Sequence, residues 1–199
     1  MIPVKKNRTA GFIIGGIILV IGIFIITTYN GLVKKDEKVK LQWNEVQNAY
    51  QRRLSLIPNI VNVVRGVSEF EQTTLEKITQ ARSKAASVNI NTNTVSADEF
   101  NQQAAAQDEL ASITNNLIIR IEKYPTLKGT AAYSGLQTQL EGTERRIKVA
   151  RKDFNEAINA YNSSVRSFPT KLVAGIFGFT EKTGFQSDAG ADKSIEIKF

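Results

Sequence analysis

The first apolar stretch of the chain runs from Thr9 to Val33 without a charged residue. A helix of about 20 apolar residues, at about 1.5 Å each, crosses the hydrocarbon core of a bilayer. A cleaved signal peptide has a shorter apolar core followed by small residues, whereas Thr27-Thr28-Tyr29-Asn30 follows this one. The stretch therefore predicts one retained membrane-spanning helix, and no other segment of the sequence approaches its length.

Beyond this stretch, apolar residues recur at alternating spacings of four and three, which places them on one face of a helix. The first such stripe consists of Val39, Trp43, Val46, Tyr50, Arg53, Ile57, Ile60, Val64 and Val67. Pro58 lies inside the stripe, and because the register continues across it, we predict a kink there and not a chain reversal. Gly66 is the predicted break, since glycine weakens a helix and polar residues follow it.

Two further helices are predicted in the middle of the chain. Helical spacing resumes at Leu75, Ile78 and Ala81. Residues 88–95 have the composition of a loop, and Ser96 with Glu99 forms a predicted capping box. The helix that follows carries Leu110, Ile113, Leu117, Ile121 and Tyr124, and we predict that it stops near Pro125.

The last stripe is the longest without an interruption, and Pro169 is its predicted end. It consists of Leu136, Leu140, Thr143, Ile147, Ala150, Phe154, Ala157, Tyr161, Ser164 and Phe168. Such a repeat over more than four heptads is typical of helices in an antiparallel bundle or coiled coil. The predicted fold class is therefore all-α: an N-terminal transmembrane helix, then an up-and-down antiparallel bundle of three to four long helices.

These patterns predict a basic N-terminal flank over 1–9, a transmembrane anchor over 10–32, a helical bundle over 33–169 and an irregular C-terminal tail over 170–199. The tail begins with an apolar segment, 172–179, that is too short to span a bilayer. Packing onto the end of the bundle is favoured over contact with a partner or lipid, because large exposed apolar patches are uncommon. The alternating residues 195–199 could extend the edge of a sheet.

Composition limits the chemistry that the chain can perform. Cys and His are absent, which removes thiolate metal sites, the commonest metal ligand and the commonest general base. No cluster of Asp and Glu has calcium-loop spacing, and no glycine-rich phosphate loop is present. The sequence therefore predicts no catalytic residue, no metal and no cofactor; a hydrolase that uses only carboxylate pairs is the enzymatic alternative.

The net charge of +7 does not by itself indicate a nucleic-acid partner. Basic residues are interspersed with acidic ones along the predicted helices, as in 141–146, and no basic platform with interleaved aromatic residues is present. The charge is typical of a solvated helical face with a mild preference for anionic lipid headgroups. Three basic residues precede the apolar stretch and four follow it, so the orientation across the membrane stays open.

Arg53 falls on the apolar stripe, where an unpaired charge would be costly. We predict an ion pair with a carboxylate of another helix, Glu144 or Glu122. An ion pair that fixes the helix register is favoured over a polar ligand site, since polar residues in helical seams often specify register. Pro58 and Asn59 fit either a hinge or a static kink, and the pattern does not separate the two.

Gly11, Gly15 and Gly22 share one face of the apolar stretch. Small residues at this spacing let two helices approach closely in lipid, although glycine is also simply tolerated in membrane helices. The glycine face therefore predicts a homo-oligomer that assembles through the span.

Several segments occur in a fixed order: Trp43-Asn44-Glu45-Val46, Arg52-Arg53-Leu54-Ser55-Leu56-Ile57-Pro58-Asn59, Glu122-Lys123-Tyr124-Pro125-Thr126-Leu127-Lys128 and Thr143-Glu144-Arg145-Arg146-Ile147. With them the chain closely resembles the bacterial LemA family from the apolar stretch to the tail. Two positions depart from the family pattern: Phe70 stands where the family often has His, and Arg145 where it often has Asn. The resemblance implies a single-pass protein of the bacterial cytoplasmic membrane, with a bundle usually described with four helices and no established catalytic activity.

Three functions remain open at this point. The first is a non-enzymatic, self-associating scaffold that presents its bundle and tail to an unknown protein partner. The second is an oligomer that organises or remodels the membrane, and the third is an enzyme that works through carboxylates. Trp43 and Tyr124, which belong to the family segments, complete the set of structural or interaction candidates.

Overall fold

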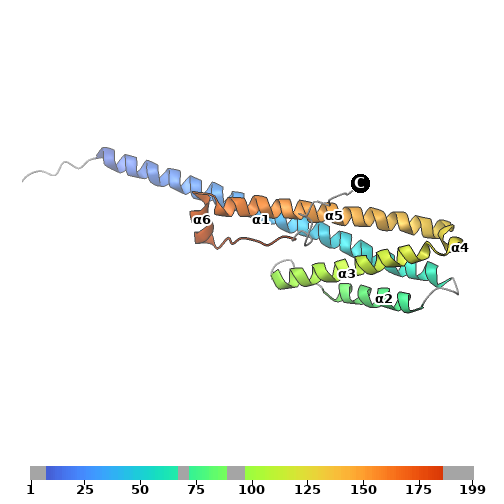
Figure 1. Ribbon diagram of the computed structural model, residues 1–199. Helices are drawn as coiled ribbons and strands as arrows, with labels where there is room; N and C mark the ends of the chain where they lie inside the picture. The colour runs from blue at the N-terminus through green and yellow to red at the C-terminus, as the bar shows by residue number, and fades with distance from the viewer. Residues whose placement is uncertain (1–7, 67–71, 89–96, 186–199) are drawn as a thin grey trace, which may run out of the picture. The chain divides into compact units, whose positions relative to one another are not determined.

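A computed structural model describes residues 8–66, 72–88 and 97–185, and the regular structure in these ranges is helical (Figure 1). The helices in chain order are α1 (Arg8–Arg65), α2 (Gln72–Ser87), α3 (Ala97–Ile121), α4 (Pro125–Lys128), α5 (Ala131–Arg166) and α6 (Thr170–Phe177). The predicted all-α class is confirmed. The predicted loop residues 89–95, Ser96 of the predicted capping box and the alternating segment 195–199 lie outside the described residues.

Helix α1 is 58 residues long and continues through Pro58. The chain therefore does not reverse at this proline, as the unbroken register predicted. The helix ends at Arg65, one residue before Gly66, so the predicted position of the break is also correct. One helix thus carries both the uncharged apolar stretch and the first bundle stripe.

The described residues fall into two compact units. Unit 1 comprises residues 8–39 and 157–182, and unit 2 comprises residues 40–66, 72–88, 97–156 and 183–185. Helices α1 and α5 contribute residues to both units, whereas α2, α3 and α4 belong to unit 2 and α6 belongs to unit 1.

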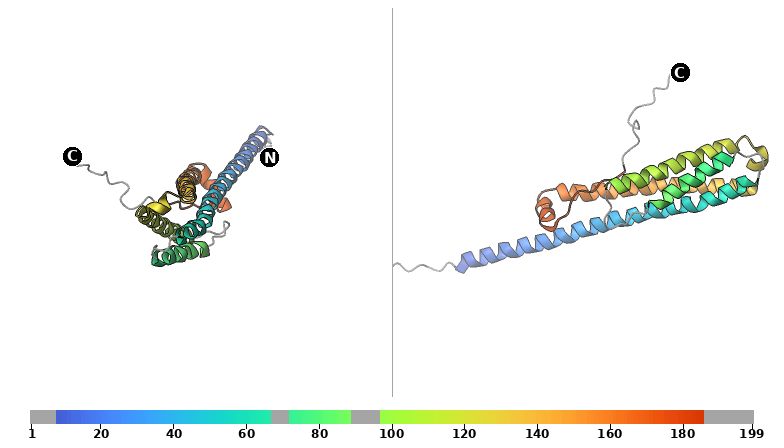
Figure 2. Two further views of the ribbon diagram at one scale, coloured as in Figure 1. Left: turned by 90° about the vertical axis from the view of Figure 1, so that its right-hand side faces the viewer. Right: turned by 90° about the horizontal axis from the view of Figure 1, so that it is seen from below.

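Unit 2 is a helical bundle, in which α2 and α3 lie beside the second half of α1 and the first part of α5 (Figure 2). The stripes predicted from the sequence supply its core. The buried cluster includes Leu54, Ile57, Ile60 and Val64 of α1, Leu75 and Ile78 of α2, Leu110, Leu117 and Ile121 of α3, and Leu140 of α5. Burial of these apolar side chains is the main force that holds the helices together.

The ends of two helices differ from the prediction. Helix α3 stops at Ile121, so Tyr124 is not part of it, and Pro125 is the first residue of α4 instead of a terminator. Proline suits this place because it has no N–H to leave unbonded in a first turn. Helix α5 ends at Arg166, and Phe168, predicted to continue the stripe, is 83% exposed. The residue before a proline is disfavoured in helical geometry, which ends the stripe before Phe168.

In unit 1, the apolar tail segment forms α6, which packs through Val173 and Ala174. The helix ends at Phe177 and is followed by Gly178, whose φ of 75° is the left-handed conformation of a common helix terminator. Figure 1 shows that α6 turns steeply away from the direction of α5. One side of α6 is therefore packed within unit 1, and packing of the tail onto the end of the bundle stays a prediction. The other side of α6 is exposed.

The first turns of α1 carry a continuous apolar surface that nothing in unit 1 covers. The exposed apolar residues are Phe12, Ile13, Ile14, Ile17, Ile18, Leu19, Val20, Ile21, Ile23, Phe24 and Ile26. Within the described part of the chain, α1 is the one helix that contains a window long and apolar enough to cross a membrane.

Candidate functional site

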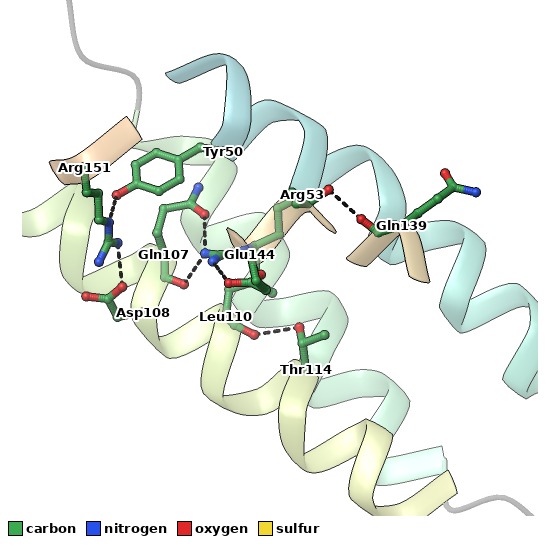
Figure 3. A network of polar contacts seen from close by, with 10 residues as sticks. Tyr50, Arg53, Gln107, Asp108, Leu110, Thr114, Gln139, Glu144 and Arg151 are labelled. Atoms are coloured by element: carbon green, nitrogen blue, oxygen red, sulfur yellow. Dashed lines mark hydrogen bonds and ion pairs between the residues drawn. The ribbon is translucent and has the colours of Figure 1, made fainter. Parts of the chain in front are cut away.

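Arg53 is the centre of a polar network that joins three helices of unit 2 (Figure 3). It lies on α1 and is 2% exposed. Its Nε donates to Oε1 of Glu144 on α5 at 2.7 Å, and its Nη2 donates to the other oxygen of that carboxylate. Its Nη1 donates to the main-chain oxygen of Gln107 on α3 at 2.9 Å and to the side-chain oxygen of the same residue at 3.1 Å. All three guanidinium nitrogens of this buried cation are therefore bonded.

Of the two carboxylates that the stripe pattern suggested for Arg53, the structure pairs it with Glu144. Glu122 forms an ion pair with Lys128, and both of these side chains are substantially exposed. A forked contact between guanidinium and carboxylate has a fixed geometry as well as a high strength. It therefore holds α1 and α5 in one register.

A second network lies on the same three helices. The Nε of Arg151 on α5 donates to the hydroxyl oxygen of Tyr50 on α1 at 2.9 Å, and its Nη2 donates to Oδ1 of Asp108 on α3 at 2.6 Å (Figure 3). Burial raises the pKa of Tyr50 to about 12, although the neighbouring Arg151 partly opposes this rise. Glu144 and Arg151 are seven residues apart and share a face of α5, so the two networks are consecutive cross-links of one bundle.

Replacement of Tyr50 by Phe is expected to change how stability depends on pH. The pKa of Tyr50, about 12 in the folded chain, exceeds the ordinary value of 10.0, so folding keeps this hydroxyl neutral. The contribution of the neutral hydroxyl to stability is therefore fully present below pH 10. This stabilisation is lost as the pH rises toward 12. Tyr50→Phe should cost about 1 kcal/mol at neutral pH through its lost hydrogen bond. It should also remove the alkaline loss, as urea unfolding at neutral and alkaline pH would measure. Parallel pH profiles of the two chains would contradict the expectation.

Trp43 anchors an aromatic cluster in unit 2. Its ring lies 5.1 Å from the rings of Phe100 on α3 and Phe154 on α5, and 6.1 Å from that of Phe185. The indole Nε1 is buried and has no hydrogen-bond partner among the described residues. Trp43 therefore contributes through apolar packing, as a core residue and not as an exposed contact.

Two asparagines of α5 hold the chain that follows α6. In unit 2, Asn155 donates to the main-chain oxygen of Phe185 at 2.9 Å and accepts from its N–H at 2.8 Å. In unit 1, Asn162 makes the same pair of bonds with Lys182, at 2.7 and 2.9 Å. The sequence pattern did not predict that these two asparagines bind the chain after α6. The available signal was two asparagines seven residues apart on one face of a helix.

An open groove of about 580 Å³ lies between α1 and α5 on the surface of unit 2. It is lined by Gln42, Glu45, Asn48, Ala49, Arg52, Arg145, Arg146, Val149, Ala150 and Asp153. Both signs of charge occur next to the exposed apolar residue Val149. Arg145, one of the two departures from the family pattern, belongs to this surface.

The remaining candidates do not come together in one site. Gly11, Gly15 and Gly22 lie on the apolar part of α1, where an added Cβ would meet nothing within 4 Å. Pro58 is half-buried and Asn59 is exposed, and a hinge at this position stays a prediction. Tyr124 is half-buried just before α4. Among the described residues, no group of three or more Asp or Glu side chains is placed to hold a metal ion.

Fold and site together define a class of protein: a helical bundle that shares one long helix with an apolar segment able to cross a bilayer. Comparison with known proteins gives the particular family. Residues 42–199 match the LemA family. Protein LemA of Metamycoplasma hominis is 30% identical over 175 residues, which cover 86% of this chain and 76% of that protein. The chain belongs to the LemA family.

Shorter similarities connect the chain to magnetosome proteins. Magnetosome protein MamQ 2 of Paramagnetospirillum magneticum is 33% identical over 79 residues, which are 40% of this chain and 29% of that protein. Magnetosome protein MamQ of Magnetospirillum gryphiswaldense is 30% identical over 79 residues, with the same coverage. These matches extend over less than half of the chain.

Proposed function

We propose that this chain is a non-enzymatic, membrane-anchored scaffold that self-associates and presents its bundle to a protein partner. The observation that carries the proposal is α1, which continues from the exposed apolar run into the core of the bundle. An anchor that shares a helix with the bundle needs no linker segment between the two. This arrangement suits a protein whose task is to keep a binding surface at a membrane.

The polar networks support a structural role for Arg53. A ligand site needs donors or acceptors that are available to the ligand, whereas each guanidinium nitrogen of Arg53 already has a partner within the bundle. Buried polar groups of this kind specify how helices align. We therefore assign Arg53, Gln107 and Glu144 to the register of the bundle and not to catalysis.

The membrane in this proposal is the bacterial cytoplasmic membrane, which α1 crosses once. The basic residues on the two sides of the apolar run are nearly equal in number, so they favour neither orientation. Protease protection in spheroplasts, with a tag placed after Phe199, measures the orientation directly. A digested tag would mean a bundle outside the cytoplasm, and a protected tag a bundle inside it.

Self-association through the glycine face can be tested with a single larger side chain. Gly15→Leu should lower the association constant of the full-length chain in mild detergent by about tenfold, a loss of about 1.4 kcal/mol, and so lower the oligomeric fraction. The cause would be that leucine keeps two helix backbones apart. Cross-linking and light scattering over a range of chain-to-detergent ratios would measure the fraction.

Gly16→Leu is the matched control for this experiment. Gly16 is the next residue along α1, so its side-chain position points about 100° away from that of Gly15. An added Cβ meets nothing within 4 Å at either position. Equal oligomerisation of both variants and the parent chain would refute assembly through this face.

A second candidate function, a membrane-organising oligomer, is favoured by the basic residues after the apolar run. Lys34 and Lys38 are exposed, and they lie within five residues of the end of the uncharged stretch of α1. Lysines placed there attract anionic headgroups. Deformation of anionic vesicles by the full-length chain, measured by electron microscopy, separates this function from a scaffold that leaves the bilayer unchanged.

A further inference from the structure

Helix α6 has one buried side and one exposed apolar side. Val173 and Ala174 are buried in unit 1, whereas Leu172 is 61% exposed and Ile176 is 73% exposed. Leu172 and Ile176 are four residues apart and therefore lie on the same face of the helix. Phe168, just before α6, is also exposed. Large exposed apolar side chains that lie close together mark a surface that a membrane or another molecule covers.

Contacts in unit 1 fix the level of α6 along α1. The Nζ of Lys35 donates to the main-chain oxygen of Ala160 at 3.4 Å and to the hydroxyl of Ser164, so the end of α5 lies beside Lys35. The ring of Tyr29 lies 4.8 Å from that of Phe177, at the end of α6, and 5.7 Å from that of Phe179. Tyr29 precedes Lys35 by six residues, or about 9 Å along a helix. Helix α6 therefore lies beside the uncharged stretch itself.

That level corresponds to the boundary of a bilayer. The uncharged stretch from Thr9 to Val33 would be about 37 Å long as a helix, whereas a hydrocarbon core is about 30 Å thick. Lys34 and Lys35 directly follow the stretch and need the headgroup region, so the last turns of the stretch lie near that region. Tyr29 lies in these turns, and tyrosine rings are enriched at this boundary.

We propose that α6 lies in the membrane interface, with Leu172, Ile176 and Phe168 inserted among lipid chains beside the point where α1 leaves the bilayer. The proposal rests on the membrane anchoring of α1 proposed above. Lipid is the occupant because the same unit carries the exposed apolar residues of α1, and the contacts of Tyr29 place the end of α6 beside that uncharged stretch. Interfacial helices bury an apolar face about 5–10 Å into the headgroup and acyl boundary. Exposed Lys171, within α6, is then available to anionic headgroups.

The chain has no cysteine, so a single one can be introduced for labelling without any removal of native residues. Three full-length variants are needed: Ile176→Cys on α6, Ile18→Cys in the apolar stretch and Ile119→Cys on α3. Ile119 is the matched control, since it is an isoleucine that is 63% exposed in unit 2. Each is labelled with an environment-sensitive dye and reconstituted into vesicles of phosphatidylcholine and phosphatidylglycerol. Lipids with a nitroxide quencher at a shallow or a deep acyl position then report the depth.

Shallow quenchers should reduce the emission of the label at position 176 at least about twofold more than that of the label at position 119, as an interfacial depth requires. The label at position 18 should respond most to the deep quencher. Quenching at position 18 without quenching at position 176 would overturn the α6 proposal and leave the anchor intact. Protection of position 176 from aqueous iodide without lipid quenching would mean that protein covers α6, which also overturns it. Lack of quenching of the label at position 18 would refute the membrane anchoring of α1 and, with it, the proposal for α6.

Discussion

Glu144→Gln is expected to lower the free energy of unfolding by about 2–4 kcal/mol, because it leaves the charge of Arg53 buried without its counter-ion. Arg53 is 2% exposed, and Glu144 is the carboxylate that bonds to two of its three nitrogens. Glutamine can accept one of those hydrogen bonds, but it carries no charge. The partial exposure of Glu144, 35%, keeps the expected loss below that of a fully buried pair.

Urea unfolding of the full-length chain in mild detergent would measure this loss. Trp43 is the single tryptophan of the chain, so its fluorescence reports the unfolding of unit 2. The matched control is Glu109→Gln, which makes the same change in an exposed ion pair with Lys84. Exposed pairs contribute up to about 1 kcal/mol, so the control should change stability by less than that amount. Equal losses in both variants would contradict a special role for the buried pair.

Arg53→Leu separates the structural role of Arg53 from a ligand site. Leucine fits the apolar stripe, and Glu144 has enough exposure to regain water when Arg53 is absent. We therefore expect Arg53→Leu to lower the thermal midpoint by less than Glu144→Gln does. A variant that folds normally but loses its activity in cells would instead favour a polar ligand site at Arg53.

Trp43→Ala is expected to produce the largest loss, about 3–5 kcal/mol, because it opens a cavity among packed aromatic rings. The ring centroids of Phe100 and Phe154 both lie 5.1 Å from that of the indole, and both rings would lose this contact. Because the variant lacks tryptophan, helical circular dichroism in urea must replace fluorescence as the measurement.

Trp43→Phe is the informative comparison. It keeps an aromatic ring in the cluster and removes an N–H that has no partner among the described residues. The smaller ring gives up some packing, but loss of the unbonded N–H offsets part of this cost. We expect a net change within about 1.5 kcal/mol, as for other apolar exchanges of similar volume. A loss as large as that of Trp43→Ala would show that the N–H has a partner that the cluster does not reveal.

The periodic pattern predicted the elements well, because the spacing of apolar residues encodes which face of a helix is buried. It also predicted that Arg53 needs a carboxylate, since a cation on a buried stripe must be paired. It did not predict the hydrogen bonds from Arg53 to Gln107. An amide side chain can form its hydrogen bonds with water, so its place in the pattern does not indicate a buried partner. Periodicity also failed at Phe168, where the spacing continued after the helix had ended.

The periodic pattern could not predict the contacts of the tail with α5, for a different reason. Asn155 and Asn162 bond to main-chain groups of Phe185 and Lys182. Every residue except proline offers the same main-chain donor and acceptor, so sequence does not distinguish one tail position from another. Only the three-dimensional course of the chain after α6 reveals which of them the asparagines reach.

The length of α1 has a consequence for the order of events during synthesis. The first residue of α5, Ala131, follows Arg65 by 66 positions, so a ribosome needs roughly 3 to 13 s to pass from one helix to the other. During that interval the apolar stretch can enter the bilayer, while Arg53 still lacks Glu144 and remains hydrated. The nascent chain would thus be tethered before its bundle closes. The chain with an incomplete bundle, whose apolar side chains are still exposed, would be held at a membrane surface. Its diffusion toward other unfolded chains would be restricted to two dimensions.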